Sequence, residues 1–264
     1  MSVSIATVNK APTAVFADTV TVLEDAGLIR MAKFLTNVAA GPGSDETNQH
    51  IASVTCAVAS TDVAHFKVQP SITLDTHELS FQSTEDYFGV VEVTVTVTDN
   101  GDTTNGGVNK LTGKFKIRIL DVNDRPSFTA GAPITLKEDA PAYNALWATN
   151  IVPGPTNENT QTTQFTITAS RPEVFKISPT INSAGFLAFT LAEDANGFVD
   201  LVITLQDNAG TDNGGIDKSF ETKVRFTIEP INDAPVFIAG PSITVNEDAA
   251  PFTYKAWATD VKAG

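Results

Sequence analysis

Apolar and polar residues alternate with a period of two in several segments of the chain. Val90–Thr98 alternates valine with mostly threonine, and Val199–Leu205 carries a similar pattern. Such alternation is typical of strands that bury one face and wet the other. No stretch shows a sustained apolar period of 3.6 residues, which a helix would need. The pattern therefore predicts a chain built from β-strands.

Two further segments alternate basic and apolar residues, Lys114–Ile119 and Lys223–Ile228. This alternation predicts an outer strand with one wet face. Asn105–Gly107 and Asn213–Gly215 each read Asn-Gly-Gly. These residue types supply the positive φ that a hairpin loop needs. An internal calcium loop is the alternative for these segments, but their later acidic residues do not match, which favours a plain hairpin.

The chain contains an internal repeat of about 110 residues. Asn9, Asn123 and Asn232 open three similar segments, 114 and then 109 residues apart. An acidic signature follows each of them, and its glutamates (Glu24, Glu138 and Glu247) have the same two spacings. Two independent markers with equal spacing indicate a true sequence repeat.

Repeats of this length, with short strands punctuated by Gly, Pro, Asn and Asp, predict an all-β fold of tandem Greek-key, seven-strand β-sandwiches of the cadherin/Ig-like type, with a partial third repeat. The expected division is an N-terminal linker at 1–11, a first repeat at 12–124, a second at 125–233 and the start of a third at 234–264. Half a sandwich would expose its core, so we expect the chain to be a piece of a longer repeat array.

The charge balance narrows the possible partners. Asp and Glu number 31 against 17 Lys and Arg, giving a formal net charge of -14. An acidic chain repels phosphate, which argues against nucleic acid and anionic membranes as partners. No apolar run approaches the roughly 18 residues of a membrane helix, so no direct membrane insertion is expected. The first residues lack the pattern of a secretory signal.

The single cysteine excludes an intrachain disulfide. Cys56 lies in an alternating segment in which Val54, Cys56 and Val58 would share one face. This placement predicts a buried structural thiol rather than a nucleophile. His50, His65 and His77 have no serine or cysteine in a nucleophile context. No catalytic constellation emerges, and we expect no enzyme activity.

Acidic residues gather where one repeat ends and the next begins. Ile119–Pro126 closes the first repeat and Glu229–Pro235 the second, and a Glu-Asp pair follows each at short range. Carboxylate, amide and backbone carbonyl oxygens are the ligands that Ca²⁺ takes, six to eight per ion, whereas Mg²⁺ keeps several waters. Recurrence at the repeat spacing favours calcium sites over ordinary acidic turns, which remain the alternative.

These segments resemble the cadherin and cadherin-like family. Asp121–Phe128, DVNDRPSF, resembles the family's inter-domain linker D-x-N-D-N-A-P-x-F. The Glu138 segment KEDA resembles the first-strand P-E-N motif, and Trp147–Asn150 resembles the stretch that opens the D-x-D ligand pair. Val95–Gly101 resembles the late-strand A-x-D-x-G segment. The Asn-Gly-Gly loops and the E-D-A signature resemble the bacterial-type domains of large surface adhesins more than animal cadherins.

The resemblance implies calcium at each junction, and it implies ligands residue by residue. For the first junction these are Glu24, Asp121, Asn123, Asp124, Asn150 and Asp207. For the second they are Glu138, Asn232, Asp233 and Asp260, and Asp86 and Asp194 are further candidates near the family's L-D-R-E motif. The chain also departs from the family: Arg125 stands in the region of the second linker Asn, Pro230 replaces a linker Asp, and Lys10 stands where Asp124 and Asp233 sit.

The function implied is mechanical: a calcium-rigidified spacer of an extracellular, cell-surface adhesin or appendage, whose partners are neighbouring repeats of the same long chain. The alternatives are a carbohydrate-binding module of a polysaccharide-active protein and homophilic adhesion. A sugar-stacking platform would need exposed aromatic side chains. Trp147 and Trp257 occupy equivalent positions of the second and third repeats, and Phe34 occupies this position in the first. A large apolar residue at the same position of each repeat favours core or interface packing over sugar stacking.

Overall fold

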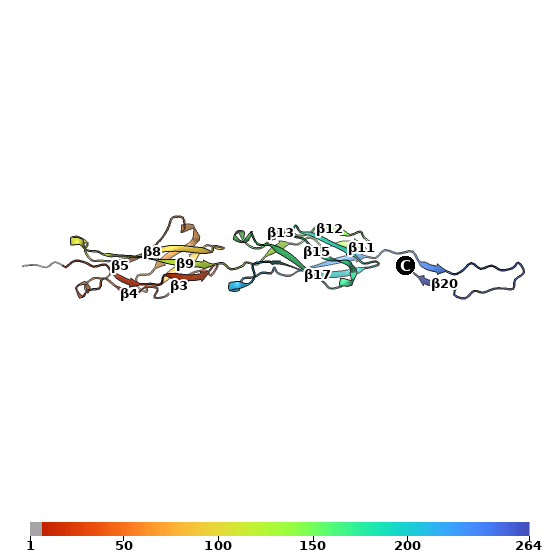
Figure 1. The fold of residues 1–264 in the computed structure, drawn as a ribbon, viewed down its shortest axis with the longest axis horizontal. Helices are drawn as coiled ribbons and strands as arrows, with labels where there is room; N and C mark the ends of the chain where they lie inside the picture. Colours follow the sequence, from red (N-terminus) through yellow and green to blue (C-terminus); the bar gives the residue numbers. More distant parts are fainter. Residues whose placement is uncertain (1–6, 264) are drawn as a thin grey trace, which may run out of the picture. The chain divides into compact units, whose positions relative to one another are not determined.

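The structure is a computed structural model that describes residues 7–263, so part of the predicted linker at 1–11 lies outside the described residues. The described chain is all-β, as predicted, apart from short 3-10 segments. Figure 1 shows the strands gathered into sandwiches. The first contains β1 (Thr13–Val15), β2 (Thr19–Leu23), β3 (Ile29–Met31), β4 (Thr36–Ala39), β5 (Ile51–Val58), β6 (Phe66–Ile72), β7 (Leu79–Ser83), β8 (Gly89–Asp99) and β9 (Lys110–Leu120).

The second sandwich repeats this order of elements. Its strands are β10 (Ser127–Thr129), β11 (Thr135–Lys137), β12 (Tyr143–Leu146), β13 (Thr149–Val152), β14 (Thr163–Ala169), β15 (Phe175–Ile181), β16 (Phe186–Leu191), β17 (Gly197–Asp207) and β18 (Thr222–Glu229). Within the described residues, three 3-10 segments lie in the loops of each sandwich: η1 (Ser44–Glu46), η2 (Val63–His65) and η3 (Thr104–Gly106) in the first, and η4 (Thr156–Glu158), η5 (Pro172–Val174) and η6 (Asp212–Gly214) in the second.

The sheet topology is the same in both sandwiches. A four-stranded sheet has the order β2-β9-β8-β5 in the first and β11-β18-β17-β14 in the second. A three-stranded sheet, β3-β7-β6 or β12-β16-β15, and a two-stranded pair, β1-β4 or β10-β13, complete each sandwich. The short β2 runs parallel to β9, and β11 runs parallel to β18.

Each sandwich encloses its own apolar core. In the first, β8 buries alternate valines against Phe81 and Phe115, and the equivalent β17 buries Val199, Leu201 and Ile203 in the second. Burying a side chain of this kind contributes about 1.5–3 kcal/mol. The predicted period of two is thus confirmed, because every second residue of these strands points into the core.

The basic-apolar strands β9 and β18 do have one wet face, but they are not outer strands. Each is the second strand of its sheet, because β2 and β11 pair along its far side. These covering strands are short and parallel, so alternation within β9 and β18 could not reveal them. The Asn-Gly-Gly prediction is confirmed: Asn105 and Asn213 have φ of 53° and 57°, within the loops that join β8 to β9 and β17 to β18.

Two further residues have the packing that the sequence predicts. The Trp147 side chain is only 5% exposed and its indole N–H donates to the Ala132 carbonyl, so it packs in the core rather than forming a sugar platform. Cys56 is half-buried and packs against the first core with Val54 and Val58, and burial raises the pKa of its thiol to about 11.

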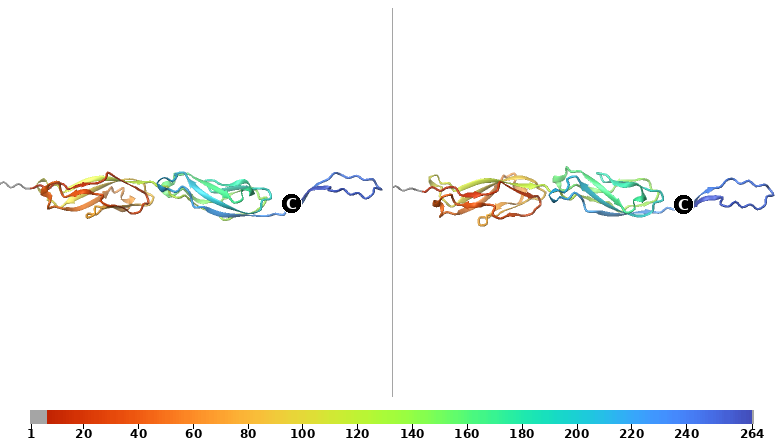
Figure 2. Two further views of the ribbon diagram at one scale, coloured as in Figure 1. Left: turned by 90° about the horizontal axis from the view of Figure 1, so that it is seen from below. Right: turned by 60° about the horizontal axis from the view of Figure 1, so that its bottom comes forward.

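Residues 234–264 form only a small part of a sandwich. β19 (Val236–Ala239) pairs antiparallel with β20 (Ala258–Lys262), the equivalent of β1 with β4. Between them the chain runs as a long open loop (Figure 2), and Val236, Phe237 and Ile238 are exposed. That these residues begin a third repeat stays a prediction.

The chain divides into two compact units whose limits do not follow the sequence repeats. Unit 1 comprises 1–126, 152–162 and 207–218, and unit 2 comprises 127–151, 163–206 and 219–264. The linker Asp121–Pro126 and the loops that contain η4 and η6 therefore belong to unit 1. The predicted repeat limits at 124 and 233 stay predictions. Within the described residues, no helix has the length and apolar character needed to span a membrane.

Candidate metal centres

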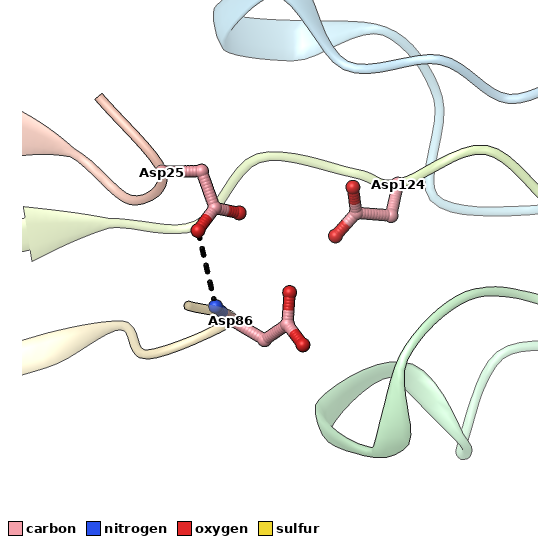
Figure 3. Close-up of side chains that lie close together, drawn as sticks. All are labelled: Asp25, Asp86 and Asp124. Atoms are coloured by element: carbon pink, nitrogen blue, oxygen red, sulfur yellow. Dashed lines mark hydrogen bonds between the residues drawn. The ribbon is translucent and has the colours of Figure 1, made fainter. Parts of the chain in front are cut away.

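Three aspartates converge beside the first linker, within unit 1. Asp25 follows β2, Asp86 lies in the turn between β7 and β8, and Asp124 belongs to the linker. One carboxylate oxygen from each lies within 4.8 Å of the others. Figure 3 shows the three carboxylates around a common space, with the Asp86 backbone N–H donating to Asp25 Oδ1 at 3.2 Å. We call these residues the first acidic group.

A second set of three aspartates occupies the equivalent positions of unit 2. Asp139 follows β11, Asp194 lies between β16 and β17, and Asp233 belongs to the second linker. Their carboxylate oxygens also lie within 4.8 Å of one another. We call these residues the second acidic group. Both groups therefore arise from the same three positions of the repeat.

Backbone conformation brings the carboxylates together. Asp25 and Asp86 have φ of 54° and 56°, and Asp139 and Asp194 have φ of 60° and 57°. Aspartate tolerates this left-handed region better than most residues because its short side chain bonds locally. The left-handed turn ends the strand, so the alternation of side chains along β2 no longer determines the direction of the Asp25 side chain.

The glutamate that precedes Asp25 holds the linker. Glu24 is 2% exposed, and its Oε1 accepts a hydrogen bond from the Val122 backbone N–H at 2.6 Å. Its Oε2 is buried and has no hydrogen-bond partner. Burial raises the pKa of Glu24 to about 7; the bond from Val122 lowers the pKa, whereas the charges of Asp121 and Asp25 raise it further.

Like charges crowd both acidic groups. Burial raises the pKa of Asp124, and the charges of Asp25, Asp86 and Asp121 raise it further. Burial and the charge of Asp25 likewise raise the pKa of Asp86. In the second group, burial and the charges of Asp139, Asp194 and Glu138 raise the pKa of Asp233. These carboxylates repel one another and have no basic side chain among them, so a bound cation would stabilise the ionised forms.

A polar network holds the other side of the first linker. The Asn123 side-chain amide donates to both Asp207 carboxylate oxygens, at 3.1 and 3.2 Å, and to the Gly210 carbonyl. The Asp124 N–H donates to Glu158 Oε1 at 2.9 Å. Burial raises the pKa of Glu158, the bond from Asp124 lowers it, and the charges of Asp124, Asp121 and Asp207 raise it. We call this arrangement the linker latch.

The first sandwich carries the same latch at its N-terminal pole. The Asn9 amide donates to Asp99 Oδ1 at 3.1 Å, and the Lys10 N–H donates to Glu46 Oε1 at 3.0 Å. Here the residue equivalent to Asp124 is Lys10, whose ammonium pairs with Asp45 at 3.3 Å. The same two hydrogen bonds therefore occur at a pole whose linker residue is basic, and Glu46 Oε2 and Asp99 Oδ2 are buried there without a hydrogen-bond partner.

The residues predicted as calcium ligands have several different placements. Asp86, Asp124, Asp194 and Asp233 belong to the acidic groups. Glu24, Glu138 and Asp121 act on these groups through hydrogen bonds or charge, and Asn123 and Asp207 belong to the latch. The remaining three are exposed: the Asn150 amide donates to the Thr129 hydroxyl, the Asn232 amide donates to the Asp233 carbonyl, and Asp260 lies on β20.

Several residues of these sites were not predicted from the sequence, among them Asp25, Asp139, Glu46 and Glu158. Asp25 and Asp139 were overlooked because the family motif points to the glutamate just before each. Glu46 and Glu158 belong to a second repeated pattern, Gly-Pro followed by Glu and then Gln three residues later, at 41–49 and 154–161. Both glutamates lie in 3-10 segments and are buried. The recurrence of this pattern in the two repeats was the available signal.

The donor set fits calcium, the ion that the resemblance implies. Every side-chain donor in the two acidic groups is a carboxylate oxygen, which suits a hard cation of high coordination number. Glu24 Oε2 and Asp124 Oδ2 are buried without a hydrogen-bond partner. Buried polar atoms are normally paired, so two unpaired anionic oxygens beside the first acidic group are a feature that a cation would satisfy.

Comparisons with known proteins identify the fold. No protein-family profile matches the chain, and no curated protein sequence matches it significantly. Among solved structures, human protocadherin-24 EC1-2 (form II) aligns with a TM-score of 0.50 and 16% identity, covering 83% of this chain and 99% of that one. Mouse cadherin-23 EC22-24 aligns with a TM-score of 0.47 and 16% identity, covering 88% and 71%. The alignment with protocadherin-24 shows that the chain has a cadherin-like β-sandwich fold.

Proposed function

We propose that the chain is a calcium-rigidified spacer: a run of structural repeats in an extracellular adhesin or surface appendage that mediates cell adhesion. The observation that carries this proposal is the pair of acidic groups, each with three carboxylates in reach of one ion at the same repeat positions. The cadherin-like fold supports it. The role is structural rather than catalytic, and the chain's partners are neighbouring repeats of the same protein.

The chain's own residues determine what a cation would change. Asp25 and Asp86 come from turns of the first sandwich, whereas Asp124 belongs to the linker. Without a cation, repulsion between these carboxylates loosens the linker from the sandwich. Calcium supplies the neutralising charge when bound. The Val122 N–H donates to Glu24 and the Asp124 N–H donates to Glu158, so these bonds place the linker backbone beside the carboxylates whose repulsion the cation would offset.

Extracellular conditions suit such a site. Sites of extracellular modules have dissociation constants of about 10⁻⁴–10⁻³ M, and calcium outside cells is abundant enough to fill them. An ion that binds only the folded state stabilises it by mass action. A chain with one cysteine has no disulfide to perform this role, so the ion would replace it.

No specific observation favours the carbohydrate-binding alternative. A sugar platform needs exposed aromatic rings at equivalent positions, but Phe34 and Trp147 are buried in the cores of their sandwiches.

The test compares the full chain in calcium and in chelator. Calcium should raise the melting temperature and give a more extended small-angle scattering profile. Asp124→Asn should reduce both responses. Asp75→Asn, which alters an exposed aspartate outside both acidic groups, should leave them unchanged. Identical melting and scattering curves in calcium and chelator would refute the proposal.

A further inference from the structure

The two acidic groups differ in how the glutamate beside them is bonded. At the first, Val122 donates to Glu24 Oε1 and Glu24 Oε2 is buried without a partner. At the second, Ile231 donates to Glu138 Oε1, and the Asn196 side-chain amide donates to Glu138 Oε2 at 3.1 Å. Both oxygens of Glu138 are therefore hydrogen-bonded, whereas one oxygen of Glu24 is open.

One residue in the turn before β8 or β17 accounts for this difference. Asn196 follows Asp194 by two positions, and the equivalent residue of the first repeat, two positions after Asp86, is Phe88. Phe88 is 46% exposed and offers no side-chain donor. The Asn196 amide also donates to the Asp194 carbonyl at 3.1 Å, which fixes its orientation towards Glu138.

A second, independent difference concerns the linkers. Asp121 places a carboxylate beside Glu24, where its charge acts on Glu24 and on Asp124. The equivalent residue of the second linker is Pro230, which has no carboxylate. The first acidic group therefore has the Asp121 carboxylate, which the second linker lacks at the equivalent position, and an unpaired glutamate oxygen beside it.

We propose that Asn196 is an affinity-determining residue that makes the second acidic group the weaker of the two calcium sites. This inference rests on the proposed function. A cation that uses Glu138 Oε2 must compete with a charge-assisted hydrogen bond, which is a strong bond. A cation that uses Glu24 Oε2 competes with no hydrogen-bond donor of the described chain and satisfies a buried oxygen. Calcium then fills the first group before the second, and the two linkers stiffen at different calcium concentrations.

The experiment measures calcium affinity at each site in the full chain by calorimetric titration. Asp124→Asn leaves the second site to be measured, and Asp233→Asn leaves the first. In the Asp124→Asn background, Asn196→Ala should tighten calcium binding about tenfold, the equivalent of losing one such hydrogen bond. Asn144→Ala is the matched control, because Asn144 is an exposed asparagine on β12 of the same sandwich. It should change nothing.

The reciprocal change tests the same point from the other site. In the Asp233→Asn background, Phe88→Asn should weaken binding, because the new amide can reach Glu24 as Asn196 reaches Glu138. A readout that needs no calcium is the NMR signal of the Asn196 side-chain amide. In chelator, the hydrogen-bonded Asn196 side-chain amide should exchange its hydrogens more slowly than an exposed amide does, and Glu138→Gln should change this rate.

The outcomes separate this inference from the proposed function. Two sites of equal affinity, or Asn196→Ala binding calcium as Asn144→Ala does, would overturn the role of Asn196 and leave the spacer proposal intact. Failure of the unsubstituted chain to bind calcium at millimolar concentrations would overturn both. Tighter binding in Asn196→Ala together with weaker binding in Phe88→Asn supports the inference.

Discussion

The N-terminal poles of the two sandwiches have the same latch but opposite charge at one linker position. In each, a buried asparagine amide donates to a buried aspartate, and the next linker N–H donates to a buried glutamate. The linker residue is Lys10 at one pole and Asp124 at the other. At both poles hydrogen bonds attach the linker, whereas a carboxylate at this linker position, close to two further aspartates, occurs only at the second pole.

The largest expected effect comes from removing the asparagine hydrogen bond that the latches at both poles share. Asn9→Ala and Asn123→Ala each remove a donor from a buried carboxylate, Asp99 or Asp207, and should cost about 1.5–3 kcal/mol of unfolding free energy. The loss should be similar at both poles and similar in calcium and chelator. Hydrogen exchange of the Lys10 and Asp124 amides is the measurement. A loss at one pole only would show that the two latches are not equivalent.

The next effect comes from exchanging the charge that separates the poles. Asp124→Lys should remove the calcium stabilisation of the first acidic group, which at ten times the dissociation constant is about 1.4 kcal/mol. The latch uses the backbone N–H of this residue, so it should survive. Thermal unfolding with and without calcium measures the change, and Asp75→Lys is the control. A full calcium response in Asp124→Lys would contradict the assignment.

In the absence of metal, the stability of the chain should depend on pH because of Glu24, which lies beside the first acidic group and not at the pole that carries Lys10. Glu24 titrates at about pH 7 in the folded chain against 4.5 as its ordinary value. A raised carboxyl pKa means that the folded state holds the proton more tightly, so this contribution is complete below pH 4.5 and is lost as the pH rises through 7. Melting temperatures in chelator should fall across this window, and Glu24→Gln should flatten the fall. An unchanged slope in Glu24→Gln would exclude Glu24 as its origin.

The smallest effect concerns the basic linker residue itself. The Lys10–Asp45 pair is largely exposed, and such pairs contribute little to stability because water and salt screen them. Lys10→Ala should therefore barely change the unfolding free energy, and added salt should weaken what little the pair provides. Denaturant unfolding at low and high salt checks this. A loss as large as that of Asn9→Ala would mean that Lys10 stabilises this pole through more than the exposed pair.

The sequence predicted the fold better than the sites, for physical reasons. A period of two over Val90–Thr98 fixes which face of a strand is buried, and the repeat spacing fixes how often the sandwich recurs. Neither shows where a side chain points once the strand ends. Asp25 lies in a left-handed turn, so its carboxylate direction depends on a φ that alternation does not encode. The resemblance named Glu24, one residue away.

The latch was hidden for a related reason. Glu158 meets Asp124 across 34 positions in the sequence, and their contact is between a carboxylate and a backbone N–H. A backbone donor has no residue type, so no motif could mark it. The covering strands β2 and β11 were missed likewise, because each is defined by its pairing with a distant strand: Thr19 pairs with Lys116, and Thr135 pairs with Thr227.

Calcium binding by the acidic groups is tested most directly by equilibrium dialysis of the full chain against calcium, with metal analysis of the bound fraction. The unsubstituted chain should bind calcium in the range of about 10⁻⁴–10⁻³ M. Asp124→Lys should lose the share bound by the first acidic group, and a chain that also carries Asp233→Lys should retain essentially none. No bound calcium in the unsubstituted chain, or equal amounts in all three, would contradict the account.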